Sequence, residues 1–185
     1  MDIADTASRA LVVYGIPPNP PLKDETGRDL GKQFELSRSN RLSFEVALRR
    51  GLSKFLRTHV ELAMARLVFV RSASDLATAI QNNHPTRLIY YGHALPGASA
   101  LLPSLGHAIE PWALVKMLRG SSVRDFDILG CSSTSIAAAV SIELPGIRVG
   151  YLRTARQDNL VVDSITLKVR ELYFDDQPLY HFPAK

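Results

Sequence analysis

The sequence predicts an α/β fold with a mostly parallel central sheet flanked by helices. Short apolar runs alternate along the chain with amphipathic segments of helical period, as in strands joined by crossover helices. The chain has 185 residues, 46% of them hydrophobic and 22% charged, which suits one globular domain with a substantial buried core. We therefore expect residues 1–185 to form a single domain.

Five apolar runs are expected to form the strands. Each is bounded by Gly, Pro or polar residues, and most are rich in β-branched or aromatic residues. The predicted strands are Ala10–Tyr14, Leu67–Val70, Leu88–Tyr91, Phe126–Leu129 and Ile147–Leu152.

Five further segments have the pattern of helices, with an apolar stripe or a capping residue at the start. The predicted helices run from about Ser43 to Leu56, from Asp75 to Gln81 with Ser74 as cap, from Glu110 to Leu118, from Ile136 to Ile142, and from Leu160 to about Phe174 with Asp158 as cap. The segment Pro17–Asn40 is polar and proline-rich, and we expect it to be a mobile loop beside the binding groove.

Composition argues against several classes of function. The single cysteine, Cys131, cannot form an internal disulfide, and the N-terminus lacks the pattern of a secretion signal, so we expect a cytoplasmic protein. No apolar run reaches the ~20 residues that cross a bilayer, and no Cys/His cluster has metal-binding spacing, so neither a membrane nor a metal or other cofactor is expected. The net charge of +4 comes from scattered Lys and Arg, which favours a solvated helix face over nucleic-acid binding.

Two reactive side chains follow neighbouring predicted strands. His93 comes after the third strand and Cys131 after the fourth, 38 residues later, which leaves room for one crossover helix. Since the carboxyl ends of parallel strands form the ligand crevice of an open α/β sheet, we expect both side chains at one edge.

Each residue has a structural and a chemical interpretation. Cys131 alone could be a small buried apolar residue, but amide groups at the start of the following helix would favour its thiolate. His93 alone could be a packing histidine, but opposite a thiol it is the natural base. The other histidines look like surface residues; they are His59, His84, His107 and His181. Among them, His107 is the reserve candidate for the base.

The segments Leu88–Ala94 and Asp127–Ser133 resemble the His and Cys motifs of caspase-like cysteine peptidases (clan CD), nearest to the bacterial CHAT branch. The resemblance spans about Arg87 to Phe174 and rests on the order, strand context and spacing of the motifs. Two positions depart from the family pattern. The family commonly has Gly directly after the histidine, whereas here Gly92 precedes His93 and Ala94 follows it. Arg153 stands where an aromatic residue is usual.

The resemblance implies a three-layer caspase-like sandwich that works as a cysteine endopeptidase. Cys131 would attack the scissile carbonyl as thiolate, His93 would protonate the leaving amine, and the backbone N–H groups of Ala94 and Cys131 would receive the oxyanion. It also implies a protein substrate, regulated proteolysis as in bacterial defence, and a pore-forming or toxin partner. A chain of 185 residues has little room for a separate sensor domain, so we expect any regulator to be a separate protein. A catalytically silent caspase-like module that binds a partner through the same groove is the alternative.

Substrate-pocket residues are predicted near the fifth strand. Arg153 and Arg156 would attract an acidic P1 side chain, whereas Asp158 would attract a basic one. Asp158 could instead be occupied as a helix cap, and Arg153 could point to the groove or to the opposite face. We favour an acidic or small polar P1 residue with Arg153 as its contact.

Overall fold

The computed structural model describes residues 9–15, 22–31, 34–57, 60–95, 100–104, 106–155 and 158–184. The chain folds as two compact units, the first formed by Met1–Ile16, Met64–Ala155 and Pro178–Lys185, the second by Pro17–Ala63 and Arg156–Gln177. The expectation that residues 1–185 form one domain stays a prediction. Periodicity along the chain does not show the division, because each unit is assembled from segments far apart in sequence.

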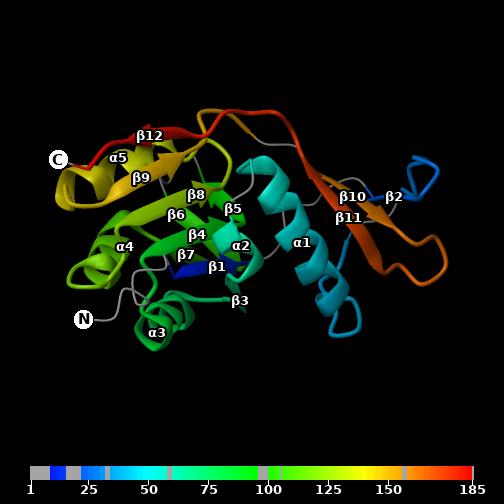
Figure 1. Cartoon of the computed structure of the whole chain (residues 1–185), viewed down its shortest axis with the longest axis horizontal. Coiled ribbons are helices and arrows are strands. Elements are labelled where there is room, and N and C mark those ends of the chain that lie inside the picture. The colour runs from blue at the N-terminus through cyan, green and yellow to red at the C-terminus, as the bar shows by residue number, and fades with distance from the viewer. Residues whose placement is uncertain are drawn as a thin grey trace. The chain divides into compact units, whose positions relative to one another are not determined.

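A six-stranded sheet forms the centre of the first unit (Figure 1). Its strands, in spatial order, are β12 (Tyr180–Phe182), β9 (Arg148–Tyr151), β8 (Asp125–Leu129), β4 (Arg87–Tyr91), β1 (Ala10–Tyr14) and β3 (Arg66–Phe69). All neighbours are parallel except β12, which runs antiparallel to β9. The predicted α/β class and mostly parallel sheet are therefore confirmed, and β12 is a strand that the sequence analysis did not predict.

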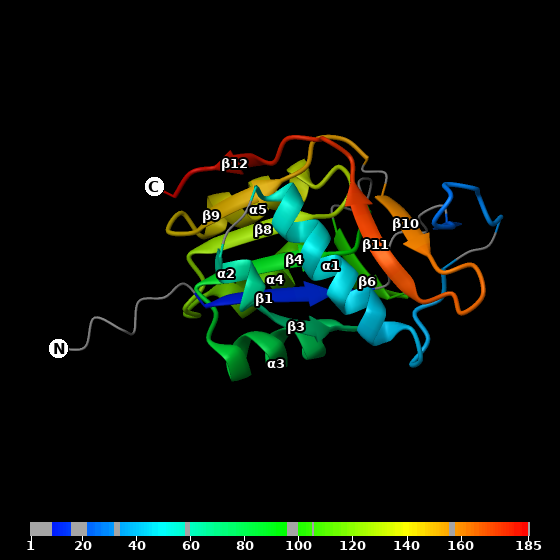
Figure 2. The ribbon, with the colours of Figure 1, turned by 45° about the vertical axis from the view of Figure 1, so that its right-hand side comes forward.

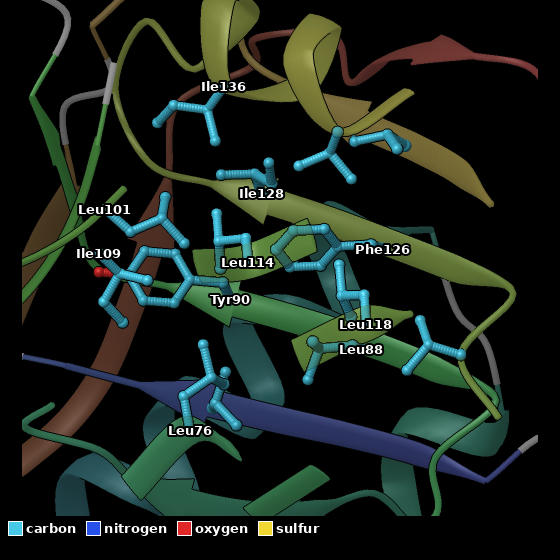
Figure 3. Close-up of a cluster of buried hydrophobic side chains, with 14 of the residues drawn as sticks. Leu76, Leu88, Tyr90, Leu101, Ile109, Leu114, Leu118, Phe126, Ile128 and Ile136 are labelled. Atoms are coloured by element: carbon cyan, nitrogen blue, oxygen red, sulfur yellow. The ribbon is translucent and has the colours of Figure 1, made fainter. Parts of the chain in front are cut away.

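Three helices cover one face of this sheet: α3 (Ala73–Asn83), α4 (Pro111–Leu118) and α5 (Thr134–Glu143). Alternate strand residues such as Leu88, Tyr90, Phe126 and Ile128 point into a core shared with these helices (Figure 3). The cap of α3 is Ser72, whose side chain accepts the N–H of Asp75. The predicted cap, Ser74, is wrong because the helix begins earlier than its apolar stripe suggests.

A second, small sheet lies between β4 and α4 in sequence. It consists of β5 (His93–Leu95), β6 (Ala100–Ser104) and β7 (His107–Ile109), with antiparallel neighbours. No strand was predicted here. His93–Leu95 is too short to show a strand pattern in the sequence, and it forms a strand because it pairs with β6.

The second unit contains α1 (Arg41–Phe55), α2 (Val60–Ala63) and a three-stranded sheet in the order β11 (Val169–Phe174), β10 (Asp158–Val162) and β2 (Leu22–Lys23). Figures 1 and 2 show α1 lying along β11. Helix α1 and strand β11 pack closely enough that a Cβ on Gly51 of α1 would lie 2.6 Å from the carbonyl oxygen of Leu172.

The predicted helix from Leu160 to Phe174 is wrong, because this segment forms the antiparallel pair β10 and β11. A tight turn separates the strands. The Asp163 side chain accepts the N–H groups of Ile165 and Thr166, and these bonds, the one from Thr166 first, lower the pKa of Asp163 to about 2. Asp158 is the buried first residue of β10, not a helix cap. Strand residues at this spacing also fit a helical stripe, so pairing between strands decides the outcome.

The segment Pro17–Asn40, expected to be a loop, contains one short strand. Leu22 of β2 is buried and pairs in parallel with Leu160 of β10. Phe34 is buried as well, and its ring stacks on Phe44 of α1 with centroids 5.5 Å apart. Residues 17–21 and 32–33 of this segment lie outside the described residues, and its mobility stays a prediction.

A buried charge cluster joins three strands of the six-stranded sheet. The Arg87 guanidinium donates two hydrogen bonds to Oδ2 of Asp127, at 2.9 and 2.6 Å, and both residues are buried. The imidazole of His181 on β12 approaches Oδ1 of Asp127 at 3.6 Å, while His181 itself is exposed on the surface, as expected. Burial by itself raises the pKa of Asp127, but the nearby imidazole of His181 and the charge of Arg87 outweigh it, and the pKa is lowered.

We predict that Asp127→Asn destabilises the protein by roughly 3–5 kcal/mol at neutral pH, because it leaves the buried Arg87 without its counter-charge. Asp125→Asn on the same strand is the matched control. Its partner Arg148 is partly exposed, so the loss should be at most ~1 kcal/mol. Urea unfolding measures both.

The same variant has a defined pH dependence. Because the folded-state pKa of Asp127 lies below its ordinary value of 3.8, its stabilisation is complete well above pH 3.8 and is lost as the pH falls through the lowered pKa. The difference between wild type and Asp127→Asn should therefore shrink in acid. A difference that grows in acid would contradict this account.

Candidate active site

The two predicted reactive residues lie at the same edge of the six-stranded sheet. Strands β4 and β8 are parallel neighbours, and Tyr91 pairs with Leu129 at their carboxyl ends. His93 and Cys131 each stand two residues beyond that pair, and both are half-buried. The structure thus brings these residues to one edge, as expected from the order of the strands.

The backbones that carry them are in close contact next to Cys131. A Cβ built on Gly130 would lie 2.8 Å from the Cβ of Ala94, 3.2 Å from its nitrogen and 3.4 Å from the carbonyl oxygen of Gly92. A real side chain cannot come so close without moving its neighbours. Glycine at position 130 therefore allows the cysteine segment to pack against the residues on both sides of His93.

The hydroxyl of Tyr90 holds the backbone on the histidine side. It donates to the carbonyl of His93 at 3.0 Å and accepts the N–H of Leu102, which is paired with His93 in the β5–β6 ladder. Figure 3 shows the Tyr90 ring among the buried side chains of the core. Burial raises the pKa of Tyr90 well above its ordinary value, so the phenol keeps the proton that it donates.

The turn after Cys131 is tied to the end of β9. The N–H of Ser132 donates to the carbonyl of Thr154 at 3.0 Å, and the N–H of Ser133 donates to that of Leu152 at 2.9 Å. Ser132 has a φ of 48°, in the left-handed region that non-glycine residues seldom occupy. These hydrogen bonds offset the free-energy cost of the left-handed backbone at Ser132, where the chain turns from β8 into α5.

Ser133 makes two further bonds through its buried hydroxyl. It donates to the carbonyl of Ile128 at 3.1 Å and accepts the N–H of Leu152, also at 3.1 Å. It stands at the N-cap position of α5 without a side-chain cap bond. The Ser133 hydroxyl therefore links β8 to the end of β9 instead of capping α5.

This arrangement changes one expectation about Cys131. Helix α5 begins at Thr134, and the two amides directly after the cysteine, those of Ser132 and Ser133, already donate to carbonyls. The predicted stabilisation of a thiolate by unsatisfied amides of the helix start therefore does not come from these two groups.

Ala94, the predicted oxyanion residue, is buried in β5 and pairs with Leu101 of β6. Its nitrogen lies beside Gly130, one residue before Cys131. The amides of Ala94 and Cys131 therefore belong to segments that are in contact, and their joint role at an oxyanion stays a prediction.

The predicted pocket residues have different surroundings. Strand β9 ends at Tyr151, so Arg153 lies in the exposed segment beyond it rather than within the strand. Its guanidinium carbon is 3.8 Å from the ring centroid of Tyr180, which places Arg153 over the C-terminal strand β12. Asp158 belongs to the second unit, and Arg156 lies outside the described residues.

Several residues that support this edge were missed by the sequence analysis. Tyr90 reads as one more apolar strand residue, and Ser133 as one of a run of capping hydroxyls. The sequence does contain a signal for Asp127 and Arg87. Arg87 begins one apolar strand and Asp127 lies within another, and a charged residue buried in a strand almost always has a partner of opposite charge. That signal does not identify the partner, which lies 40 residues away along the chain.

Among the described residues, no group of three or more His, Cys, Asp or Glu side chains is arranged to hold a metal ion. No helix in the described part of the chain is both long and apolar enough to cross a membrane. Neither a protein-family model nor a curated protein matches the sequence.

We predict that Gly130→Ala destabilises the protein by about 1–3 kcal/mol, because the added methyl group overlaps Ala94. Gly146→Ala is the matched control, since a Cβ there meets nothing within 4 Å and neither glycine has a left-handed φ. The control should change the free energy of unfolding by at most ~0.5 kcal/mol. Equal stability of the two variants in urea would show that the two segments are not in close contact.

Proposed function

We propose that this protein is a cysteine endopeptidase of the caspase-like type, with Cys131 as nucleophile and His93 as general acid and base. The observation that carries the proposal is the position of the two residues. Each lies two residues beyond the paired residues Tyr91 and Leu129, which end the adjacent parallel strands β4 and β8. The backbone segments that carry them are in contact at Gly130. A nucleophile and its base must be held within reach of one substrate carbonyl, and the shared edge supports this pair of roles for Cys131 and His93.

In the proposed reaction, the Cys131 sulfur attacks the carbonyl carbon of the scissile peptide bond. The resulting oxyanion accepts hydrogen bonds from the backbone N–H groups of Cys131 and Ala94. His93 gives a proton to the leaving amine, the C–N bond breaks, and an acyl-thioester remains. Water, deprotonated by His93, then attacks the thioester and releases the acid product and the thiol.

The proposal includes a caspase-like three-layer architecture and a protein substrate in the cytoplasm. Regulated proteolysis in bacterial defence and a pore-forming or toxin partner belong to it as well, carried only by the resemblance of the two motifs. A separate regulatory protein is also part of the proposal. A silent binding module is the second candidate. The observation that favours it is that the amides of Ser132 and Ser133 are already bonded and so are not available to activate the thiol.

We predict that Cys131→Ala reduces peptide cleavage to background and that His93→Ala reduces it at least ~100-fold, without loss of fold. Cleavage of a fluorogenic peptide library measures activity, and circular dichroism checks the fold. His107→Ala, a change of an exposed histidine on β7, is the control and should keep full activity.

Labelling with an electrophilic peptide probe separates the two candidate functions. A peptidase should be labelled at Cys131, and the label should be lost in His93→Ala. An unreactive thiol in a protein that still binds the peptide tightly would reject the peptidase and favour the binding module.

We predict that peptides with Asp at P1 are cleaved faster than matched peptides with Leu or Arg, through contact with Arg153. Arg153→Ala should lower the preference for Asp roughly tenfold, as expected for the loss of one charge-assisted contact. Tyr180→Leu, which removes the ring beneath the guanidinium, should lower it less. Arg119→Ala, at an exposed arginine of the same unit, is the control and should leave the preference for Asp unchanged. A preference for Arg at P1 would overturn the assignment.

A further inference from the structure

A groove of about 570 Å³ lies between α1 and the beginning of β11, entirely within the second unit. Among its lining residues are Leu42, Val46 and Arg50 of α1, and Lys168, Arg170 and Glu171 from the β11 side; we call it the α1–β11 groove. Its lining includes neither His93 nor Cys131, and the inference does not depend on the proposed peptidase activity.

The apolar part of the groove is exposed although it belongs to a well-packed helix. The opposite side of α1 is buried through Phe44, Leu48 and Leu52. Leu42 and Val46, one helical turn apart, are 73% and 42% exposed. Single exposed aliphatic residues are common, but a pair aligned along a hollow is typical of an interaction site.

The two walls of the groove are held together. The Ser43 hydroxyl donates to the carbonyl of Asn40 at 2.8 Å and accepts the N–H of Val169 at 3.1 Å, so the start of β11 is fixed to the first turn of α1. Further along, Gly51 allows close approach to the backbone of Leu172. A preformed groove loses little conformational entropy on binding.

The charges around the groove are mainly positive. Its lining contains the cations Arg50, Lys168 and Arg170 and one acid, Glu171. Arg170 also pairs with Asp163 at 3.0 Å. One turn after Arg50, Lys54 adds a further cation on the same side, 5.4 Å from the ring centroid of the half-exposed Tyr173.

These features together select one class of occupant. A lipid tail needs an enclosed cavity, whereas Leu42 and Val46 lie on an open surface. Nucleic acid would use the cations but neither the aliphatic pair nor Glu171, and no aromatic side chain lines the groove to stack on a base. An acidic peptide with an apolar side chain matches both the aliphatic pair and the cations.

We propose that the α1–β11 groove binds an acidic peptide segment of a partner protein. The segment inserts an aliphatic or aromatic side chain beside Leu42 and Val46 and places carboxylates against Arg50, Lys168 and Arg170.

The test selects ligands from a phage-displayed library of random linear peptides, using the full chain with Cys131→Ala so that no bound peptide is cleaved. Selected peptides are fluorescein-labelled, and their affinity is measured by fluorescence anisotropy. We expect peptides with Asp or Glu beside an aliphatic or aromatic residue. Arg50→Glu should weaken their binding at least ~10-fold, because it sets like charges against each other, and Val46→Ser should weaken it several-fold.

Two control variants make the same changes elsewhere in the second unit. Arg28→Glu reverses a charge in the turn after β2, the strand at the opposite edge of the three-stranded sheet from β11. Val60→Ser changes an 85% exposed valine on α2. Both should bind the peptides within about twofold of the parent, as expected for surface sites outside the contact.

Three results would overturn the proposal. They are the absence of selected peptides that depend on Arg50, equally tight binding of peptides whose acids are replaced by Lys, and equally tight binding of peptides whose apolar residue is replaced by Ser. A dimer in analytical ultracentrifugation that Arg50→Glu dissociates would assign the groove to a second copy of the chain and would also overturn it.

Discussion

Three neighbouring parallel strands reach their carboxyl ends at glycine, and the arrangement of the candidate site depends on the space that these glycines leave. Gly15, Gly92 and Gly130 follow directly after Tyr14, Tyr91 and Leu129, which are paired across β1, β4 and β8. The chain of the small sheet packs against two of these positions: a Cβ on Gly15 would lie 2.5 Å from the Cα of Pro103, and one on Gly130 would lie 2.8 Å from the Cβ of Ala94. Without side chains at this level, β5 and β6 can lie directly on the edge of the large sheet.

The position of Cys131 depends on a second set of contacts, which come from the far end of the chain. The turn Cys131–Ser133 is bonded to Leu152 and Thr154 beyond β9, and β9 is itself covered by β12. Aromatic packing of Phe182 on Tyr151, with ring centroids 4.7 Å apart, holds β12 in place together with the approach of His181 to Asp127. The C-terminal strand therefore supports the cysteine turn through β9, although none of its residues is adjacent to the cysteine in sequence.

Charge is used differently in the two units. In the first, a single carboxylate, Asp127, is buried between Arg87 and His181, where the low dielectric makes an unpaired charge costly. In the second, cations gather on the outside of α1 and the start of β11, around exposed aliphatic side chains. The first arrangement contributes to the stability of the sheet, whereas the second surrounds the groove for which we propose a peptide ligand.

The sequence by itself determined the elements whose pattern is local. Short, mainly apolar runs such as Leu88–Tyr91 and Phe126–Leu129 predict buried parallel strands, and their order places His93 and Cys131 at one edge. Only the tertiary structure decided the identity of Asp158–Phe174, because its apolar spacing suits a helix as well as the hairpin that forms when β10 pairs with β2 and β11. It also decided the partners of Asp127, Ser133 and Arg153, since hydrogen bonds, charge contacts and ring contacts between residues 19 to 54 positions apart leave no periodic trace in the chain. Local periodicity reports which face of an element is apolar, and the free energy of packing determines which segments meet there.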